Sequence, residues 1–326
     1  MKKTLSANIQ AIILAGVAAL AIVQPVITQA APVAQQKTQA PGYYRMMLGE
    51  LEITALYDGA THLPTSLLKG INEQDAQKLL ARMFLENNPS GVQTAVNGYL
   101  INTGKKLILV DAGTAQCFGS SLGNLLNNLQ AAGYQPEQID TVLLTHLHAD
   151  HACGINKEGK MAFPNATVYV AKNEADYWLS PKETAKAPAE LQAFFKMSQD
   201  AVAPYATAKK LKTYKIGDKL EGVEVVSTPG HTPGHVSFLF QSKNQSMLIW
   251  GDIVHNHAVQ FARPEVAIEF DTNKEEAIAT RKKIFKQAAE NQLWVGGAHM
   301  PFPGIGHVRT EKEGYSWIPV EYSPIQ

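Results

Sequence analysis

Apolar residues recur along the chain with two periods, and each period predicts one class of element. From Leu51 to Tyr57 apolar and polar residues alternate, which predicts a strand that the turn signal Asp58-Gly59 closes. Further short runs bounded by turn residues predict strands at 98–102, 106–110, 141–145, 167–171, 223–227, 236–241 and 247–250. Ordered structure is expected to begin near Tyr43.

Segments with helical periodicity interrupt these strands. They lie at 73–87, 120–132, 172–179, 189–200 and 274–291. In the second segment four leucines share one helical face, Leu122, Leu125, Leu126 and Leu129. Gly133 then marks its end, and before the last segment Thr272 and Glu275 have the spacing of a capping box. Strands with helices between them predict an α/β protein, in which two packed sheets are covered on their outer faces by helices.

The start of the chain has the pattern of a secretory signal peptide. Two lysines precede the apolar stretch 11–23, and 28–30 is an acceptable cleavage site, so residues 1–30 are expected to be removed near Ala30. The weaker alternative is a permanent membrane anchor, but Gln24 and Pro25 interrupt the apolar stretch. We expect a periplasmic or secreted protein with no stable membrane anchor.

The next segment, 31–41, is polar, rich in alanine and proline and without period, which predicts a disordered mature N-terminus. The 326 residues, 45% of them hydrophobic, are enough for one large domain or two small ones. Lys and Arg number 29, as do Asp and Glu, and loss of Lys2 and Lys3 leaves 27 against 29. A nucleic-acid binder would show a basic stripe instead, so no nucleic-acid partner is expected.

The densest chemistry lies in one short run. Three imidazoles and one carboxylate fall within six consecutive residues, His146, His148, Asp150 and His151. If the preceding apolar residues 142–144 carry this run inward, solvent cannot satisfy all four side chains. Imidazole suits zinc and its neighbours, and a carboxylate can bind one metal or bridge two. The run therefore predicts a buried metal site.

Three more candidate ligands, His231, Asp252 and His299, lie far apart along the chain. Asp252, like Asp111 and His146, directly follows an apolar run, and loops at strand ends are where sites are usually assembled. Two cations about 3.5–4 Å apart with a bridging hydroxide would supply both a nucleophile and a Lewis acid. Hydrolysis is the expected chemistry.

The run 146–151, followed by His231, Asp252 and His299, resembles the metallo-β-lactamase superfamily, whose fold is an αββα sandwich. Segments 40–46, 228–235, 302–307 and 317–320 are similar to methyl parathion hydrolase and related exported lactonases and esterases. The resemblance covers nearly the whole mature chain. It implies a single hydrolase domain over 42–326 and a homodimer.

The resemblance also implies a division of ligands between two metals. One metal is held by His146, His148 and His231, and the other by Asp150, His151 and His299, with Asp252 bridging both. Zinc is the expected ion at both positions, with manganese, cobalt or iron as alternatives. Asp252 and Asp150 are the catalytic candidates, Asp252 as the bridge and Asp150 as a proton donor to poorer leaving groups.

Other residues near this run are expected to support the site rather than bind metal. Asp111 would orient a histidine through its second ring nitrogen, although a plain turn aspartate is the alternative. His235 is expected to support a ligand in the same way, and His255 and His257 are expected to lie behind the ligands or at the surface. His62 and His307 are given still less weight.

Four aromatic residues lie in segments that resemble the substrate-pocket segments of methyl parathion hydrolase, namely Phe118, Trp178, Phe194 and Phe195. The alternative is that two or more belong to the core, because Phe194 and Phe195 are adjacent on a predicted helix and cannot easily face the same way. Trp178 is the preferred pocket residue, since large aromatics often anchor such pockets.

These features predict a hydrolase of small neutral substrates, in which a metal-bridging hydroxide attacks a phosphotriester, an aryl ester or a lactone. The first alternative is a quorum-quenching acyl-homoserine lactonase with the same metals, and the second is a non-catalytic periplasmic zinc-binding protein. Asp252 at the bridging position argues against the β-lactamase branches.

The two cysteines, Cys117 and Cys153, would enter an oxidising compartment, so a disulfide is possible. Cys153 lies two residues after His151 and is also a conceivable metal ligand. A small buried hydrophobic residue is the preferred interpretation over a ligand.

Overall fold

A computed structural model describes residues 32–85, 90–220 and 222–325. The chain divides into two compact units, Met1–Gln39 and Ala40–Gln326. The predicted signal peptide, 1–30, lies outside the described residues. Residues 32–42 contain no helix or strand, and strand β1 begins at Tyr43, where ordered structure is predicted to start.

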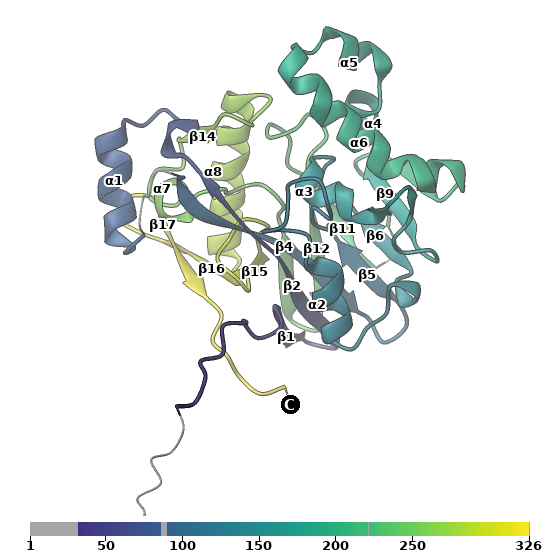
Figure 1. Ribbon diagram of the computed structural model, residues 1–326. Coiled ribbons are helices and arrows are strands. Elements are labelled where there is room, and N and C mark those ends of the chain that lie inside the picture. Colours follow the sequence, from purple (N-terminus) through teal and green to yellow (C-terminus); the bar gives the residue numbers. More distant parts are fainter. Residues whose placement is uncertain (1–31, 86–89, 221, 326) are drawn as a thin grey trace, which may run out of the picture. The chain divides into compact units, whose positions relative to one another are not determined.

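The unit Ala40–Gln326 is built on two sheets (Figure 1). The first has the order β1-β2-β4-β5-β6-β9-β10. Its strands are β1 (Tyr43–Leu48), β2 (Leu51–Leu63), β4 (Val92–Asn102), β5 (Leu107–Val110), β6 (Thr141–Leu143), β9 (Thr167–Ala171) and β10 (Leu211–Tyr214). The pairs from β1 to β5 are antiparallel, whereas those from β5 through β6 and β9 to β10 are parallel.

The second sheet has the order β11-β12-β13-β15-β16-β17. Its strands are β11 (Glu224–Ser227), β12 (Val236–Ser242), β13 (Gln245–Ile249), β15 (Trp294–Gly296), β16 (Ile305–Thr310) and β17 (Tyr315–Pro319). Only β13 and β15 pair in parallel within this sheet. Two small two-stranded sheets join β3 (Leu68–Lys69) to β14 (Ala267–Ile268) and β7 (Asn156–Lys157) to β8 (Lys160–Met161).

The helices are α1 (Glu73–Arg82), α2 (Leu125–Ala131), α3 (Ala149–Ala152), α4 (Lys172–Trp178), α5 (Pro181–Lys186), α6 (Ala189–Thr207), α7 (His257–Gln260) and α8 (Lys274–Glu290). Residues of α2, α4 and α6 pack on the outer side of the first sheet and those of α8 on the outer side of the second, whereas α5 stands away from the sheets (Figure 1). Among the residues described, none of these helices combines the length and the apolar character that crossing a membrane requires.

Side chains that point alternately to the two faces of each strand produce the layers of the fold. Ile108 of β5 and Ile249 of β13 lie in one core between the two sheets. Their neighbour Leu109 packs instead with residues of α2 and α6, and Leu248 packs with residues of α8. Because successive side chains of a strand point to opposite faces, each sheet contributes to one shared core and one helix-covered core. The fold is the predicted αββα sandwich.

One turn prediction is wrong. Asp58-Gly59 does not close the strand, because β2 continues to Leu63 with a register shift between Tyr57 and Gly59. Asp58 is buried, and its carboxylate accepts hydrogen bonds from the backbone N–H groups of Thr114, Gly123 and Leu125 and from the Thr114 hydroxyl. These long-range bonds hold both ends of the loop 114–124 against β2.

The same contacts explain why helix α2 begins at Leu125 and not at residue 120. Gly123 has φ +86°, and a Cβ there would lie 2.2 Å from the carbonyl oxygen of Ala115, so the chain before Leu125 is a tight loop. Other bounds also differ from the prediction. Helix α1 ends at Arg82, and α6 continues to Thr207. The N-cap of α8 is Asn273 and not Thr272, because the side chain of Asn273 accepts from the N–H of Glu276.

The two cysteines form a disulfide, Cys117–Cys153. It joins the loop 114–124 to the segment that follows α3. Cys153 is buried, as expected of a small apolar residue, but it is paired, which excludes it as a metal ligand.

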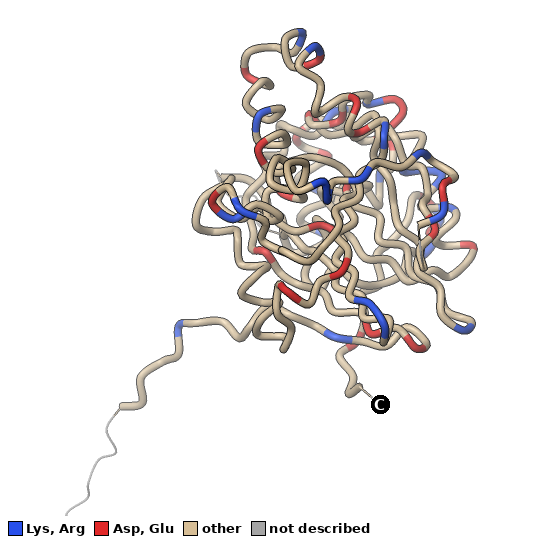
Figure 2. The backbone as a smooth tube through the Cα atoms, turned by 90° about the vertical axis from the view of Figure 1, so that its right-hand side faces the viewer, with Lys and Arg blue, Asp and Glu red and all other residues tan. Residues whose placement is uncertain are grey.

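Charged residues of both signs are mixed along the trace, as Figure 2 shows. Several exposed pairs are ion pairs within one helix, such as Lys172 with Asp176 and Lys196 with Asp200. Exposed pairs of this kind contribute little to stability. The concentrated charge of the molecule is buried, at the edge where the two sheets meet.

We predict that Asp58→Asn lowers the free energy of unfolding by about 2–4 kcal/mol, because an amide nitrogen would face backbone donors that lose their acceptor. The matched control is Glu50→Gln, at a carboxylate whose side chain is 76% exposed. Denaturant unfolding of both variants checks this, and equal midpoints would contradict the role of Asp58.

Removal of the disulfide by Cys117→Ala together with Cys153→Ala is expected to lower the free energy of unfolding by about 2–4 kcal/mol, because the unfolded chain loses a cross-link. The unaltered protein should reach the same unfolding midpoint once a reductant is added. A midpoint that neither the substitutions nor the reductant moves would show that the cross-link does not form.

Candidate metal centre

The candidate ligands leave the ends of strands that neighbour each other. His146 follows β6, whose parallel neighbour β5 ends at Val110 just before Asp111. Asp252 follows β13, and His299 follows its parallel neighbour β15. Because parallel strands end at the same edge of a sheet, each pair of loops emerges side by side. The edges of the two sheets meet there, since the N–H of Val236 donates to the carbonyl oxygen of Thr145 at 3.0 Å.

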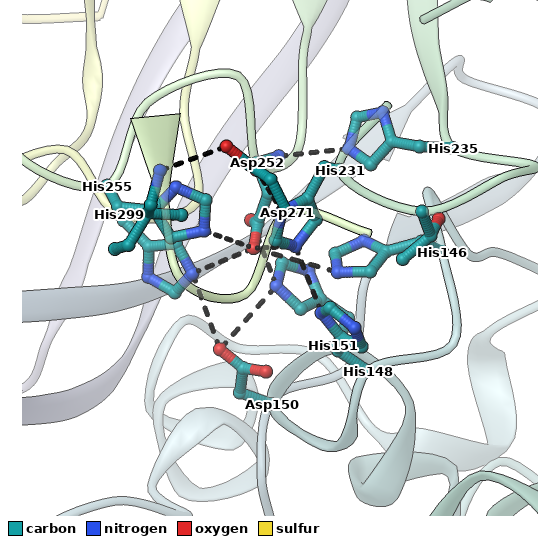
Figure 3. Close-up of polar contacts among 12 residues, drawn as sticks. His146, His148, Asp150, His151, His231, His235, Asp252, His255, Asp271 and His299 are labelled. Atoms are coloured by element: carbon teal, nitrogen blue, oxygen red, sulfur yellow. Dashed lines mark hydrogen bonds and ion pairs between the residues drawn. The ribbon is translucent and has the colours of Figure 1, made fainter. Parts of the chain in front are cut away.

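All seven predicted ligands lie together at this edge (Figure 3). The first cluster consists of His146, His148, His231 and Asp252, whose candidate ligand atoms lie within 4.8 Å of one another. The second consists of Asp150, His151 and His299, within the same limit. The grouping is the one that the sequence resemblance implies, and the metal-binding role of each residue stays a prediction.

Asp252 belongs to the first cluster and also contacts the second. Its Oδ1 is 3.1 Å from Nε2 of His151 in the second cluster, and its Oδ2 is 3.1 Å from Nε2 of His231 in the first. Oδ2 also lies 3.2 Å from Nε2 of His299 and 3.6 Å from Nε2 of His146. A carboxylate in this position can bridge two ions.

The donor set fits two divalent cations. Nε2 of His146, Nε2 of His151 and Oδ1 of Asp252 are buried, and none makes a hydrogen bond within the described part of the chain. Buried polar atoms are nearly always partnered, so such a group calls for a ligand. Imidazole nitrogens with two carboxylates are a ligand set that zinc and similar ions accept.

Electrostatics favour positive charge in this site. Burial lowers the pKa of His146 and of His148 well below the ordinary value, which keeps both imidazoles neutral and able to coordinate. Burial also lowers the pKa of His231, but the carboxylates of Asp252 and Asp271 outweigh it and raise that pKa to about 9. A neighbourhood that attracts a proton so strongly also attracts a metal cation.

Outer partners fix the orientation of the imidazoles. Asp111 lies 2.8 Å from Nδ1 of His151 and also accepts from the N–H and hydroxyl of Thr145. The carbonyl oxygen of Ala95 accepts from Nδ1 of His299 at 2.8 Å. Nε2 of His235 accepts a hydrogen bond from the backbone N–H of Asp252 at 3.1 Å. Burial lowers the pKa of His235 to about 3, so this nitrogen is free to accept. Such contacts leave the other ring nitrogen of each ligand facing the site.

The structure adds residues that sequence reasoning missed. Asp271 lies 2.9 Å from Nδ1 of His231 and plays toward it the part that Asp111 plays toward His151. Glu174 is a buried acid beside the ligand loops. Both are single acids in a loop or helix start, so local sequence offers no signal for either.

His255 belongs to the site and not to the surface. Its Nε2 lies 3.1 Å from Oδ2 of Asp252, and its ring stacks on His299 with 5.0 Å between centroids. Its place three residues after Asp252 is a signal that sequence reasoning could have used. The other histidines lie apart from the clusters, His257 at the start of α7, His62 exposed on β2, and His307 paired with the carbonyl oxygen of Leu293.

Two of the four aromatic candidates, Trp178 and Phe195, are buried in the helix-covered core, and the other two are accessible. Trp178, 6% exposed, packs edge-on against His148 with ring centroids 5.0 Å apart. Phe195 is only 1% exposed and lies against Trp178 in the helix-covered core. Helix α6 turns this side chain inward, as the alternative interpretation of a core residue expects, and a role in substrate binding stays a prediction. Phe194, 37% exposed, and Phe118, 41% exposed, remain accessible.

We predict that Asp252→Ala reduces bound zinc from two ions to at most one per chain, because the carboxylate between the clusters is lost. Elemental analysis after zinc loading and gel filtration measures this. The control is Asp176→Asn, at an exposed side chain paired with Lys172. Two firmly held ions in Asp252→Ala would disprove the bridging position.

Comparison with known proteins agrees with this geometry. Residues 91–305 match the family model of the metallo-β-lactamase superfamily. A solved structure of a hydrolase of that superfamily, AbOPH, is 48% identical, covering 88% of this chain and all of the other, with a TM-score of 0.85.

Two lactonases are also similar. AidC, described as a dizinc quorum-quenching lactonase in complex with the product N-hexanoyl-L-homoserine, is 30% identical over 87% of this chain and 99% of its own, with a TM-score of 0.79. The N-acyl homoserine lactonase of Bacillus thuringiensis is 25% identical over 214 residues, which is 57% of this chain and 77% of that protein. The chain belongs to the metallo-β-lactamase superfamily, and it is a hydrolase of the dinuclear metal-dependent kind.

Proposed function

We propose that this hydrolase opens lactone rings, with N-acyl-homoserine lactones as its substrate class. The observation that carries the proposal is the buried Asp252 between two histidine clusters, in a chain similar over nearly its whole fold to a dizinc lactonase. The relatives from Bacillus thuringiensis named as N-acyl homoserine lactonases support the same class.

Hydrolysis of a lactone adds water to the carbonyl carbon, breaks the ring C–O bond and leaves a hydroxy acid after a proton reaches the alkoxide. Two divalent cations, when bound, supply Lewis acidity and make water a better nucleophile. Asp252 and Asp150 offset part of their positive charge. Asp111, Asp271 and the carbonyl of Ala95 keep the imidazoles turned toward the centre.

Asp150 is suited to handle the proton. Its side chain is 21% exposed, whereas that of Asp252 is only 2% exposed. Its Oδ2 lies 3.3 Å from Nε2 of His299, at the border between the clusters and solvent. A carboxylate there can accept the proton that the attacking water loses and then pass it to the leaving alkoxide.

Neutral organophosphate triesters and aryl esters are the second candidate class. The ring of Trp178 beside His148, together with the exposed Phe118 and Phe194, favours planar apolar groups. The resemblance of segments 40–46 and 302–307 to methyl parathion hydrolase supports the same class. The water nucleophile would then attack phosphorus.

We further propose zinc as the resident metal, export of the mature protein and assembly as a homodimer. The dizinc relative supports zinc. The Cys117–Cys153 disulfide supports export, because such bonds persist in oxidising compartments. Elemental analysis, cell fractionation and sedimentation of the purified protein test the three statements separately.

The function is tested with purified, zinc-loaded protein on three substrates: an N-acyl-homoserine lactone, an aryl acetate and an aryl phosphotriester. We expect kcat/KM for the lactone to exceed the other two by at least about tenfold, which corresponds to 1.4 kcal/mol of transition-state discrimination. Asp252→Ala should lose at least about 100-fold on every substrate, since even outer partners of metal ligands contribute about 10–100-fold.

Faster cleavage of the phosphotriester would replace the first proposal by the second. Two bound ions without turnover of any of the three substrates would contradict both and favour a zinc-binding protein without catalysis.

A further inference from the structure

A buried carboxylate outside the ligand set ties two ligand loops together. Glu174 is the third residue of α4, and its side chain is fully buried. Buried carboxylates are costly unless they are well paired, so the contacts of this one call for an explanation.

Its two oxygens accept from two different loops. Oε1 accepts the backbone N–H of Leu147 at 2.9 Å. Oε2 accepts the hydroxyl of Thr232 at 2.7 Å and the backbone N–H of Gly234 at 3.0 Å. Leu147 stands between His146 and His148, and Thr232 directly follows His231, so one side chain fixes the backbone that carries all three histidines of the first cluster.

The loops belong to different sheets. Leu147 lies in the loop after β6 of the first sheet, and Thr232 lies between β11 and β12 of the second. The imidazoles they carry converge, with Nε2 of His231 3.0 Å from Nδ1 of His148. Glu174 therefore joins the two loops whose imidazoles must come together.

Two further observations show that α4, α6 and the two ligand loops pack tightly here. The hydroxyl of Ser198 on α6 donates to the carbonyl oxygen of Leu147 at 2.6 Å, so both the N–H and the carbonyl group of Leu147 are held by side chains. A Cβ at Gly234 would lie 2.1 Å from the backbone nitrogen of Glu174, so only glycine admits α4 at this distance.

The donor pattern favours the carboxylate form. The backbone N–H groups of Leu147 and Gly234 can only donate, and the hydroxyl of Thr232 also donates to Glu174, so the ionised acid, which is the stronger acceptor, fits these partners best. Burial raises the pKa of Glu174 to about 6, so the charge is present at neutral pH.

We propose that Glu174 is a positioning residue that presets His146, His148 and His231 for their cation. The second cluster has other supports, Asp111 for His151 and the carbonyl of Ala95 for His299, and does not depend on this side chain. The loss of Glu174 therefore affects one of the two ions. The inference rests on the metal-binding part of the proposed function and on no particular substrate.

The test uses the full mature protein with Glu174→Gln, loaded with zinc and titrated with a competing chelator whose zinc affinity is known. Glutamine keeps the shape, but in either orientation of its amide an N–H₂ group faces a backbone N–H that loses its acceptor, that of Leu147 or that of Gly234. We expect one ion to bind about 10–100-fold more weakly while the other keeps its affinity. The control Asp176→Asn, two residues along α4 and exposed, should bind both ions as the unaltered protein does.

Thr232→Val is the milder second variant, because it removes one bond to Oε2 and leaves the carboxylate in place. It should weaken the same ion to a smaller extent, and it carries the test if Glu174→Gln does not fold. Unchanged affinity for both ions, or equal weakening of both, would overturn the inference. An unaltered protein that binds no zinc would instead overturn the proposed function, and this inference with it.

Discussion

The structure depends on one buried carboxylate, Asp252, and on what satisfies it. Its side-chain oxygens lie within 3.6 Å of five imidazoles, those of His146, His151, His231, His255 and His299. A buried charge is costly unless it is paired, and the carboxylates of Asp252 and Asp271 raise the pKa of His231 to about 9. A proton on an imidazole can therefore pair Asp252, and a bound metal cation would take the place of that proton. Metal binding would then both compete with protonation and stabilise the folded protein.

The sandwich makes that concentration of charge possible. Each ligand loop leaves a strand whose alternate residues are fixed in a core, as Ile249 is before Asp252 and Leu143 is before His146. The backbone bond from Val236 to Thr145 joins the two sheet edges at the site. The packing of strand residues in the cores therefore holds the ligand side chains close together. Without that support they would separate and be solvated by water.

Features that are local in sequence could be predicted, and features that depend on distant partners could not. The run His146 to His151 and the short apolar run Met247 to Trp250 could each be interpreted from a few consecutive residues. Asp58-Gly59 has the composition of a turn, but four hydrogen bonds from residues more than fifty positions away keep it in a strand. The inward direction of Phe195 likewise depends on how α6 packs, which helical periodicity alone does not determine.

The candidate metal ligands and the accessible aromatic residues stand on different segments, which bears on the choice of substrate. The ligands stand on strand ends, and the acids behind them are buried, so the nucleophile and its electrostatics are fixed by the sandwich. The accessible aromatic residues stand elsewhere, Phe118 on the loop 114–124 and Phe194 on α6. That loop is attached at its ends by Asp58 and next to Phe118 by the disulfide to Cys153, two residues after His151. A lactone and a phosphotriester require the same nucleophile and differ in shape and charge around the reacting atom. We therefore expect discrimination between them to depend on these attached segments more than on the predicted metal ligands.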